Sequence, residues 1–195
     1  MKVLSEPASA RDRLLRAAAI AFGAKGFHGT TTRDIASAAG MSPAAVYVHY
    51  RSKEDLLYAI SHEGHEAIRD LLLEAEGATS DPRRQLSLAV HGFIYHHAED
   101  HTVARTVNHE IDALSPEHRD EVQRIRREID ACMRRIVERG VSQGAFTAES
   151  PRLTSLALLS LGIDVARWYR DDRTWTPGVV ADLYVRLALR LVGAP

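Results

Sequence analysis

The chain has 195 residues, of which 45% are hydrophobic and 26% charged, and these proportions exclude a disordered, collagen-like or rod-shaped chain. Its single cysteine, Cys132, excludes an internal disulfide framework and suits a reducing compartment. The longest uncharged apolar stretch, residues 153–163, is about half the ~20 residues that a membrane-spanning helix needs. No signal-peptide pattern precedes it, so we expect a soluble, cytoplasmic protein.

The net charge of −1 is unevenly distributed. Residues 1–60 contain eight basic and five acidic side chains, a net charge of +3, whereas the rest of the chain contains 17 and 21, a net charge of −4. A mildly basic N-terminal segment on an acidic body favours a nucleic-acid-binding module carried by a second domain, with chance asymmetry as the alternative.

Hydrophobic residues recur every three to four positions over residues 11–25, which predicts an amphipathic helix that ends at Gly26. Hydroxyl residues then mark three further helix starts, because a side-chain oxygen can accept a hydrogen bond from a free N–H at a helix N-terminus. Gly40 is expected to end the first of these three helices. The three expected N-cap residues are Thr31, Ser42 and Ser52.

A capping residue followed by proline recurs along the rest of the chain, at residues 81–82, 115–116, 150–151 and 176–177. Proline is tolerated at the first helical position because the N–H that it lacks would have no partner there. No segment alternates apolar and polar residues as a half-buried strand does, and no repeat of 20 to 50 residues is found. We predict an all-α fold with about nine helices.

Residues 30–57 predict a helix-turn-helix motif, in which two short helices flank a tight turn at residues 39–42. The second helix of such a motif enters the DNA major groove with its N-terminal residues at the base edges. Ser42, Pro43 and Ala44 are small enough for a close approach, and Tyr47 and His49 can donate hydrogen bonds to phosphates. The alternative is a motif used only for packing.

Three residues outside this second helix add to the expected interface. Lys53 lies near the start of the next helix, where free N–H groups already favour a phosphate. Arg33 can donate two hydrogen bonds to guanine, and Thr32 adds a hydroxyl donor.

The segment resembles the N-terminal domain of TetR-family transcriptional regulators over about residues 8–60. It matches the pattern T-x-R-x-I-A-x-x-A-G-x-S-x-x-x-x-Y-x-x-F/Y-x-x-K-x-x-L. Ala45 departs from the family, which commonly has Ser or Thr there, so one hydroxyl contact to DNA is expected to be absent. The resemblance implies phosphate or backbone contacts for Thr32, Tyr47, His49 and Lys53, and base-edge contacts for Arg33, Ser42, Pro43 and Ala44.

The resemblance implies a helix-turn-helix DNA-binding domain over residues 1–51 and a helical effector-binding and dimerisation domain over residues 52–195. In the second domain, residues 153–166 are apolar nearly all round, so this helix must be covered on both sides. Together with the helix at 177–192 it predicts a two-fold dimer interface, with a central core helix as the alternative. The expected interface residues are Leu156, Ser160, Ile163, Leu183, Leu187 and Leu191.

Residues 108–129, 139–146 and 165–172 resemble the C-terminal domain of one branch of the family, several members of which respond to acyl-CoA thioesters or related metabolites. The resemblance therefore implies a small-molecule effector of that class. Trp168 and Tyr169 are flanked by Arg167 and Arg170. These side chains can close such a pocket, or can instead belong to the dimer interface. The candidate effector-binding residues are Phe93, Tyr95, Asn108, His109, Glu110, Arg167 and Trp168.

A run of arginines and a cluster of histidines could suggest a binding site, but each also has a structural interpretation. Arg124, Arg126, Arg127, Arg134 and Arg135 share a helix with several acids, and we expect a solvated face with helical ion pairs. Five histidines crowd the region between His91 and Glu110, where His97 and His101 could chelate a metal on one continuous helix. A helix boundary expected at residues 100–102 would separate them, and no H-E-x-x-H motif is present.

We therefore expect no catalytic residue, no metal and no cofactor. The sequence predicts a homodimeric, effector-responsive regulator, a repressor with an activator left open, whose two heads enter successive major grooves of a palindromic operator about 34–36 Å apart. The alternatives are a metal-dependent hydrolase that uses the His91–Glu110 cluster and an architectural DNA binder that needs no effector.

Overall fold

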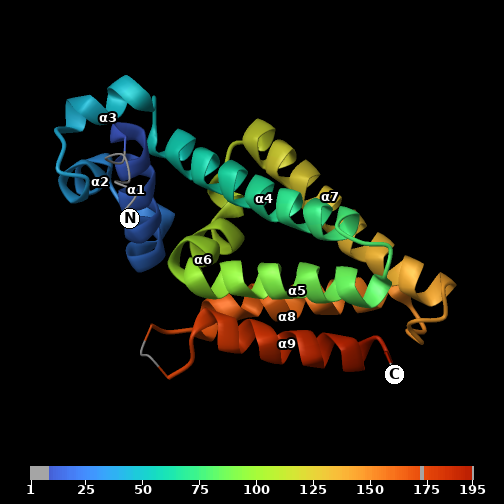
Figure 1. Cartoon of the computed structure of the whole chain (residues 1–195). Coiled ribbons are helices and arrows are strands. Elements are labelled where there is room, and N and C mark those ends of the chain that lie inside the picture. Colours follow the sequence, from blue (N-terminus) through green and yellow to red (C-terminus); the bar gives the residue numbers. More distant parts are fainter. Residues whose placement is uncertain (1–8, 172–173, 195) are drawn as a thin grey trace, which may run out of the picture.

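The computed structural model describes residues 9–171 and 174–194, and these residues form nine α-helices and one 3-10 turn. The all-α prediction is confirmed. The first three helices sit at one end of an elongated helical body (Figure 1). The elements are α1 (Ala10–Gly29), α2 (Thr32–Ala38), α3 (Pro43–His49), α4 (Lys53–Gly77), α5 (Pro82–Glu99), α6 (His101–His109), η1 (Ile111–Ala113), α7 (Pro116–Ser142), α8 (Pro151–Trp168) and α9 (Pro177–Leu191).

The helix starts that the sequence predicts are confirmed. The hydroxyls of Thr31, Ser42 and Ser52 each accept a hydrogen bond from the backbone N–H three residues later. Proline occupies the start of α5, α7, α8 and α9. Gly26 has a φ of 72° inside α1 and Gly40 a φ of 67° after α2, a backbone region that only glycine adopts readily. α1 is therefore kinked at Gly26 and continues to Gly29 instead of ending at Gly26 as predicted, whereas the capping residues and Gly40 mark the boundaries of the helices that follow.

The buried apolar residues form two clusters, and α4 belongs to both. Its first turns contribute Leu56 and Leu57 to the N-terminal cluster, whereas Ile68 and Leu72 lie in the cluster of the body. The N-terminal cluster also includes Val107 at the end of α6. One continuous helix thus joins the three-helix head to the body, and the expected boundary between residues 51 and 52 stays a prediction.

In the body, α5 lies between α4 on one side and α8 and α9 on the other (Figure 1). Within one chain, Leu153 and Leu161 of α8 are exposed, so the predicted cover of this helix by a partner copy stays a prediction. The outer face of α9 exposes Leu183, Leu187 and Leu191. Among the described residues, no helix combines the length and apolar character that a bilayer-spanning segment requires.

A glycine sets the close approach of α8 to α5. A Cβ atom added at Gly162 would overlap the ring of Phe93, which is buried and cannot move away easily. We expect Gly162→Ala to lower the free energy of unfolding by about 1–3 kcal/mol, the usual range for overpacking a core. Gly178→Ala in α9 is the control, because its added Cβ meets nothing within 4 Å. Urea unfolding of both variants tests this, and equal stabilities would contradict it.

Candidate nucleic-acid interface and internal pocket

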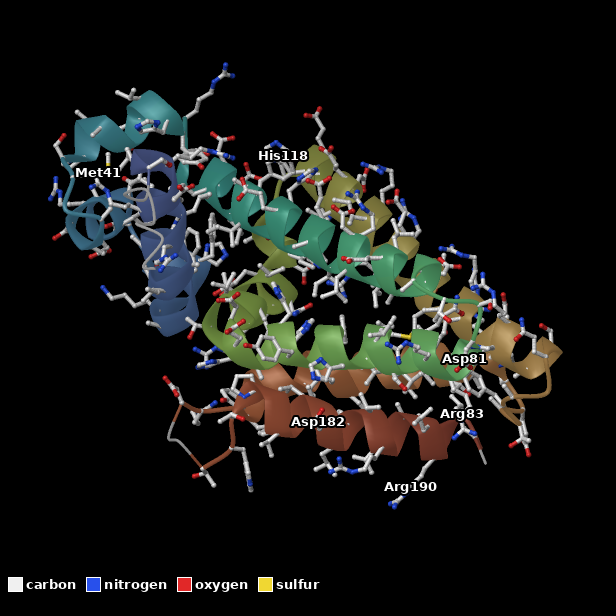
Figure 2. All side chains as sticks on the ribbon, in the orientation of Figure 1. Met41, Asp81, Arg83, His118, Asp182 and Arg190 are labelled. Carbon is white, nitrogen blue, oxygen red and sulfur yellow. The ribbon has the colours of Figure 1, made fainter. Side chains whose placement is uncertain are left out.

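The second helix of the motif, α3, is attached to the head by one buried side chain, Val46. The turn before it is closed by the backbone N–H of Met41, which donates to the Ala36 carbonyl at 2.8 Å. Met41 lies in the head, far from Asp81, Asp182 and Arg190 in the body (Figure 2). The remaining face of α3 points outward, with Tyr47 56% and Val48 80% exposed. A short, exposed helix at the end of the molecule has the shape that a DNA groove accepts.

Six of the eight predicted DNA-binding residues are exposed, on α2, on α3 or in the turn between them. The hydroxyl of Tyr47 lies 3.4 Å from the Thr32 hydroxyl, so the start of α2 and the middle of α3 meet. Arg33 and His49 are exposed and form no ion pair within the described part of the chain. Pro43 and Ala44 are also exposed. The Ser42 oxygen accepts the Ala45 N–H at 3.2 Å as a helix cap, which leaves the hydroxyl proton free to donate.

Lys53 has an internal role that the sequence did not reveal. Its ammonium group donates to the carbonyl oxygens of Phe27 at 2.8 Å and Thr30 at 2.9 Å. It also lies 4.4 Å from the centre of the Phe27 ring, a cation–π distance. Lys53 therefore ties the start of α4 to the end of α1, and its contact with a phosphate stays a prediction.

A cavity of about 550 Å³ lies inside the body, enclosed by α4, α5, α6, α7 and α8. Its walls are largely apolar, and Ile68, Phe93 and Leu159 are among the buried residues that line it. The lining residues that are exposed to solvent come from α7 and α8, so the cavity opens between these helices. They are Gln123, Arg127, Leu156 and Ser160. The volume suits a small-molecule ligand.

Two buried histidines line the cavity as neutral hydrogen-bond acceptors. Nδ1 of His65 lies 2.7 Å from the Ser61 carbonyl oxygen, and Nδ1 of His97 lies 2.8 Å from that of Phe93. Because a carbonyl only accepts, the proton is assigned to Nδ1 and the lone pair to Nε2. Burial lowers the pKa of both imidazoles to about 4, so both are uncharged near neutral pH.

Two cations of α7, Arg126 and Arg127, also line the cavity, and the prediction of a solvated face is wrong for Arg126. Arg126 is partly buried, and among the described residues it forms no hydrogen bond or ion pair. Burial lowers its pKa. One turn later, Oδ1 of Asp130 is buried without a hydrogen bond. Other arginines of the run do form ion pairs: Arg124 with Glu128 at 2.7 Å, Arg134 with Glu138 at 3.6 Å and Arg135 with Glu76 at 2.6 Å.

Of the seven candidate effector-binding residues, Phe93 and Asn108 line the cavity. The other five lie outside its wall because they fall on other faces of their helices. Tyr95 donates a hydrogen bond to Glu99 at 3.0 Å, and Glu110 accepts the Phe27 N–H at 3.2 Å. Arg167 forms an ion pair with Asp164 at 2.6 Å. His109 is exposed, and Trp168 packs against the hydrophobic core of the body.

The expected dimer residues divide between two locations. Leu156, Ser160 and Ile163 line the cavity on α8, and two of them stand at its opening. Leu183, Leu187 and Leu191 lie on the exposed face of α9.

The cavity residues that sequence reasoning missed include His65, Arg126 and Asp130. Each adjoins an apolar stripe of its helix: Arg126 and Asp130 directly follow the buried Ile125 and Ile129. A polar residue beside such a stripe faces the edge of the core, and this position is the signal that could have found them.

The histidine-rich segment does not gather into a compact group. α5 ends at Glu99 and α6 begins at His101, so His97 and His101 do not share a continuous helix, as the boundary at residues 100–102 predicted. Within the described ranges, one set of three potential ligands lies close enough for a metal, and it is Glu54, Asp55 and His118. There His118 Nδ1 already contacts the Glu54 carboxylate at 2.9 Å.

An exposed second helix on a three-helix head, carried by a hollow helical body, defines a helix-turn-helix DNA-binding regulator. Residues 14–60 match the family of bacterial regulatory proteins named after TetR, and residues 79–192 match the tetracyclin repressor-like C-terminal domain. The chain belongs to the TetR family of transcriptional regulators. These proteins are regulators and not enzymes, so the hydrolase alternative is not retained.

Three relatives illustrate the similarity. The transcriptional repressor KstR2 of Mycolicibacterium smegmatis is 31% identical, and the match covers 88% of this chain and 78% of KstR2. The crystal structure of a TetR-family regulatory protein from Rhodococcus RHA1 is 40% identical, with a TM-score of 0.88 and coverage of 97% and 100%. AibR in complex with isovaleryl coenzyme A and operator DNA shares the fold at 21% identity, with a TM-score of 0.83 and coverage of 96% and 100%.

The two buried histidines predict that stability depends on pH. Their pKa is about 4 in the folded chain and 6.5 when unperturbed, so the unfolded chain takes up protons first as the pH falls. The free energy of unfolding should therefore decrease by about 1.4 kcal/mol per pH unit for each histidine between pH 6.5 and 4, and level off below.

Urea unfolding at a series of pH values measures this slope. Replacing both His65 and His97 by Gln should flatten the curve in this range, whereas His28→Gln, at an exposed position, should not. An unchanged slope in the double variant would show that other groups cause the pH dependence.

Proposed function

We propose that the protein is a cytoplasmic, homodimeric repressor that binds a palindromic operator and is released from it by a small-molecule effector, an acyl-CoA or a related metabolite. The observation that carries the proposal is that one short helix, α6, forms part of the cavity wall and also contacts the DNA-binding head. The similarity to KstR2, named as a repressor, supports repression. AibR, crystallised with isovaleryl coenzyme A and operator DNA, supports the effector class.

The contacts of α6 provide a route from the cavity to the head. Val107 and Asn108 line the cavity. From the same helix, the hydroxyl of Thr106 donates to the Ala19 carbonyl at 3.2 Å and Arg105 donates to the Gly23 carbonyl at 3.1 Å, both in α1. An effector that prefers one position of α6 therefore changes the population of head orientations, provided that its affinity differs between them.

A residue at the end of α6 completes this connection. Glu110 accepts the N–H of Phe27, directly after Gly26, at 3.2 Å. The sequence suggested Glu110 as an effector ligand, but this hydrogen bond favours a role in coupling the body to the head.

The exposed apolar face of α8 and α9 supports the dimer. Leu183, Leu187 and Leu191 recur every four residues along α9 and are exposed, and Leu153 and Leu161 are exposed on α8. An exposed row of apolar side chains along a helix commonly marks an interface between copies. A dimer places two α3 helices on one duplex. The cavity argues against the remaining alternative, an architectural DNA binder without an effector.

DNA binding is tested with a duplex that the protein itself selects from a random pool. Arg33→Ala and Tyr47→Phe should each weaken binding, by about 1–3 kcal/mol for a lost base contact and about 0.5–1.5 kcal/mol for a lost hydrogen bond. Arg84→Ala is the control, because this exposed residue adjoins Arg83 at the opposite end of the molecule (Figure 2). Wild-type affinity in both test variants would refute the assignment of the surface.

The salt dependence of the same titration decides the role of Lys53. If its ammonium binds a phosphate, Lys53→Met lowers the slope of log K against log salt by about 1. A purely internal role leaves the slope unchanged and lowers the thermal stability of the variant.

Coupling is tested by the ratio of operator Kd values with and without saturating octanoyl-CoA. Thr106→Val and Glu110→Ala remove the two hydrogen bonds to α1 and should bring this ratio closer to 1, while the affinity for octanoyl-CoA itself, measured by calorimetry, changes little. Ser142→Ala at the end of α7 is the control. Wild-type ratios in both coupling variants would contradict the proposed route through α6.

A further inference from the structure

We propose that Arg126 is the anion-binding residue of the cavity, and that the effector is an amphipathic anion whose carboxylate or phosphate pairs with this guanidinium while its apolar part contacts Ile68, Phe93 and Leu159. This inference rests on the proposed effector function and specifies the chemistry of its ligand.

The guanidinium of Arg126 is partly removed from water. An arginine in such a position is normally paired, because desolvating a guanidinium without a counter-charge is unfavourable. Arg126 has no such partner among the described residues. Asp130, one turn away on α7, forms no ion pair with it within 4 Å and lies instead 3.9 Å from Arg134. A ligand anion would supply the missing counter-charge.

Arg127, Asp130 and three histidines are the other ionisable residues in the described lining of the cavity. Arg127 stands at the opening with no ion pair in the described ranges, and adds a second positive charge. His65 and His97 are neutral, so they neither neutralise an anion nor repel it strongly, and the third histidine is His96. Among the described lining residues, Asp130 is the one carboxylate. The balance of charge therefore selects an anion and disfavours a cation.

Two neutral imidazoles of the lining can accept hydrogen bonds. Their Nδ1 atoms already face backbone carbonyl oxygens, so Nε2 of His65 and Nε2 of His97 are left as acceptors for a donor on the ligand. An anion that also carries a hydroxyl or amide N–H can satisfy them. A hydroxylated carboxylic acid and a coenzyme A thioester both have this combination.

Four probes that share one alkyl chain test the proposal: octanoate, octanoyl-CoA, octan-1-ol and octylamine. In calorimetry and thermal shift, at least one of the two anions should bind, and the alcohol and the amine should bind at least tenfold more weakly. Binding of octanoate identifies a carboxylate at Arg126, and binding of octanoyl-CoA alone identifies a phosphate. Equal binding of octan-1-ol or octylamine, or no binding of any probe, would overturn the proposal.

Variants of α7 test the residue. Arg126→Met should weaken anion binding about tenfold or more, the effect of losing a charge-assisted hydrogen bond, and Arg126→Lys should retain part of it. Arg124→Met is the matched control, because this exposed arginine pairs with Glu128 on the same helix. Wild-type anion binding by Arg126→Met refutes the assignment.

The ligand-free protein provides a second readout. Because Arg126→Met removes an unpaired, partly buried charge, it should raise Tm by about 2–4 °C, whereas Arg124→Met should not. A lower Tm for Arg126→Met would mean that Arg126 has a structural partner, which contradicts the proposal.

Operator release, measured separately, distinguishes this inference from the proposed function. If the anion binds at Arg126 and the operator stays bound, the repressor mechanism fails and the inference stands. If octan-1-ol or octylamine releases the operator, the repressor mechanism stands and the inference fails.

Discussion

The arrangement of the molecule depends on the sharing of α4 and α6 between the head and the body. Leu56 and Leu72 of one continuous helix lie in different clusters of buried residues, so the head cannot turn freely about a flexible linker. The hydrogen bond from Thr106 to Ala19 and the one between Glu110 and Phe27 add fixed points on the other side of the head. A change in the cavity wall therefore has only a few rigid paths to the DNA-binding surface.

The cavity combines features that oppose folding. Arg126 is desolvated without a partner, Asp130 has an unsatisfied oxygen, and His65 and His97 resist protonation. Each of these reduces the stability of the ligand-free chain relative to an apolar core of the same shape. Such groups persist at binding sites because a ligand can compensate them, and stability is then linked to ligand concentration by mass action.

Local signals in the sequence predict most of the fold. Thr31, Ser42 and Ser52 act within three residues of their partners, so capping chemistry could be interpreted without knowledge of the tertiary structure. Helix number and the exposed face of α3 follow from the same local patterns.

Features that depend on contacts between distant elements could not be predicted in this way. Lys53 reaches carbonyls more than twenty residues earlier, and the charge of Arg126 suggested solvent although its helix turns it toward the cavity. The sequence placed Glu110 near the ligand for its chemistry alone. Its hydrogen bond to Phe27 depends on how α6 meets α1, which no spacing along the chain encodes.

The shallow attachment of α3 has a consequence for how regulators of this design diversify. With Val46 as its single buried residue, the helix can exchange its outward side chains at little expense in folding stability. Promoter preference can therefore drift through a few substitutions in duplicated genes, while the inherited scaffold and the molecule it senses remain the same.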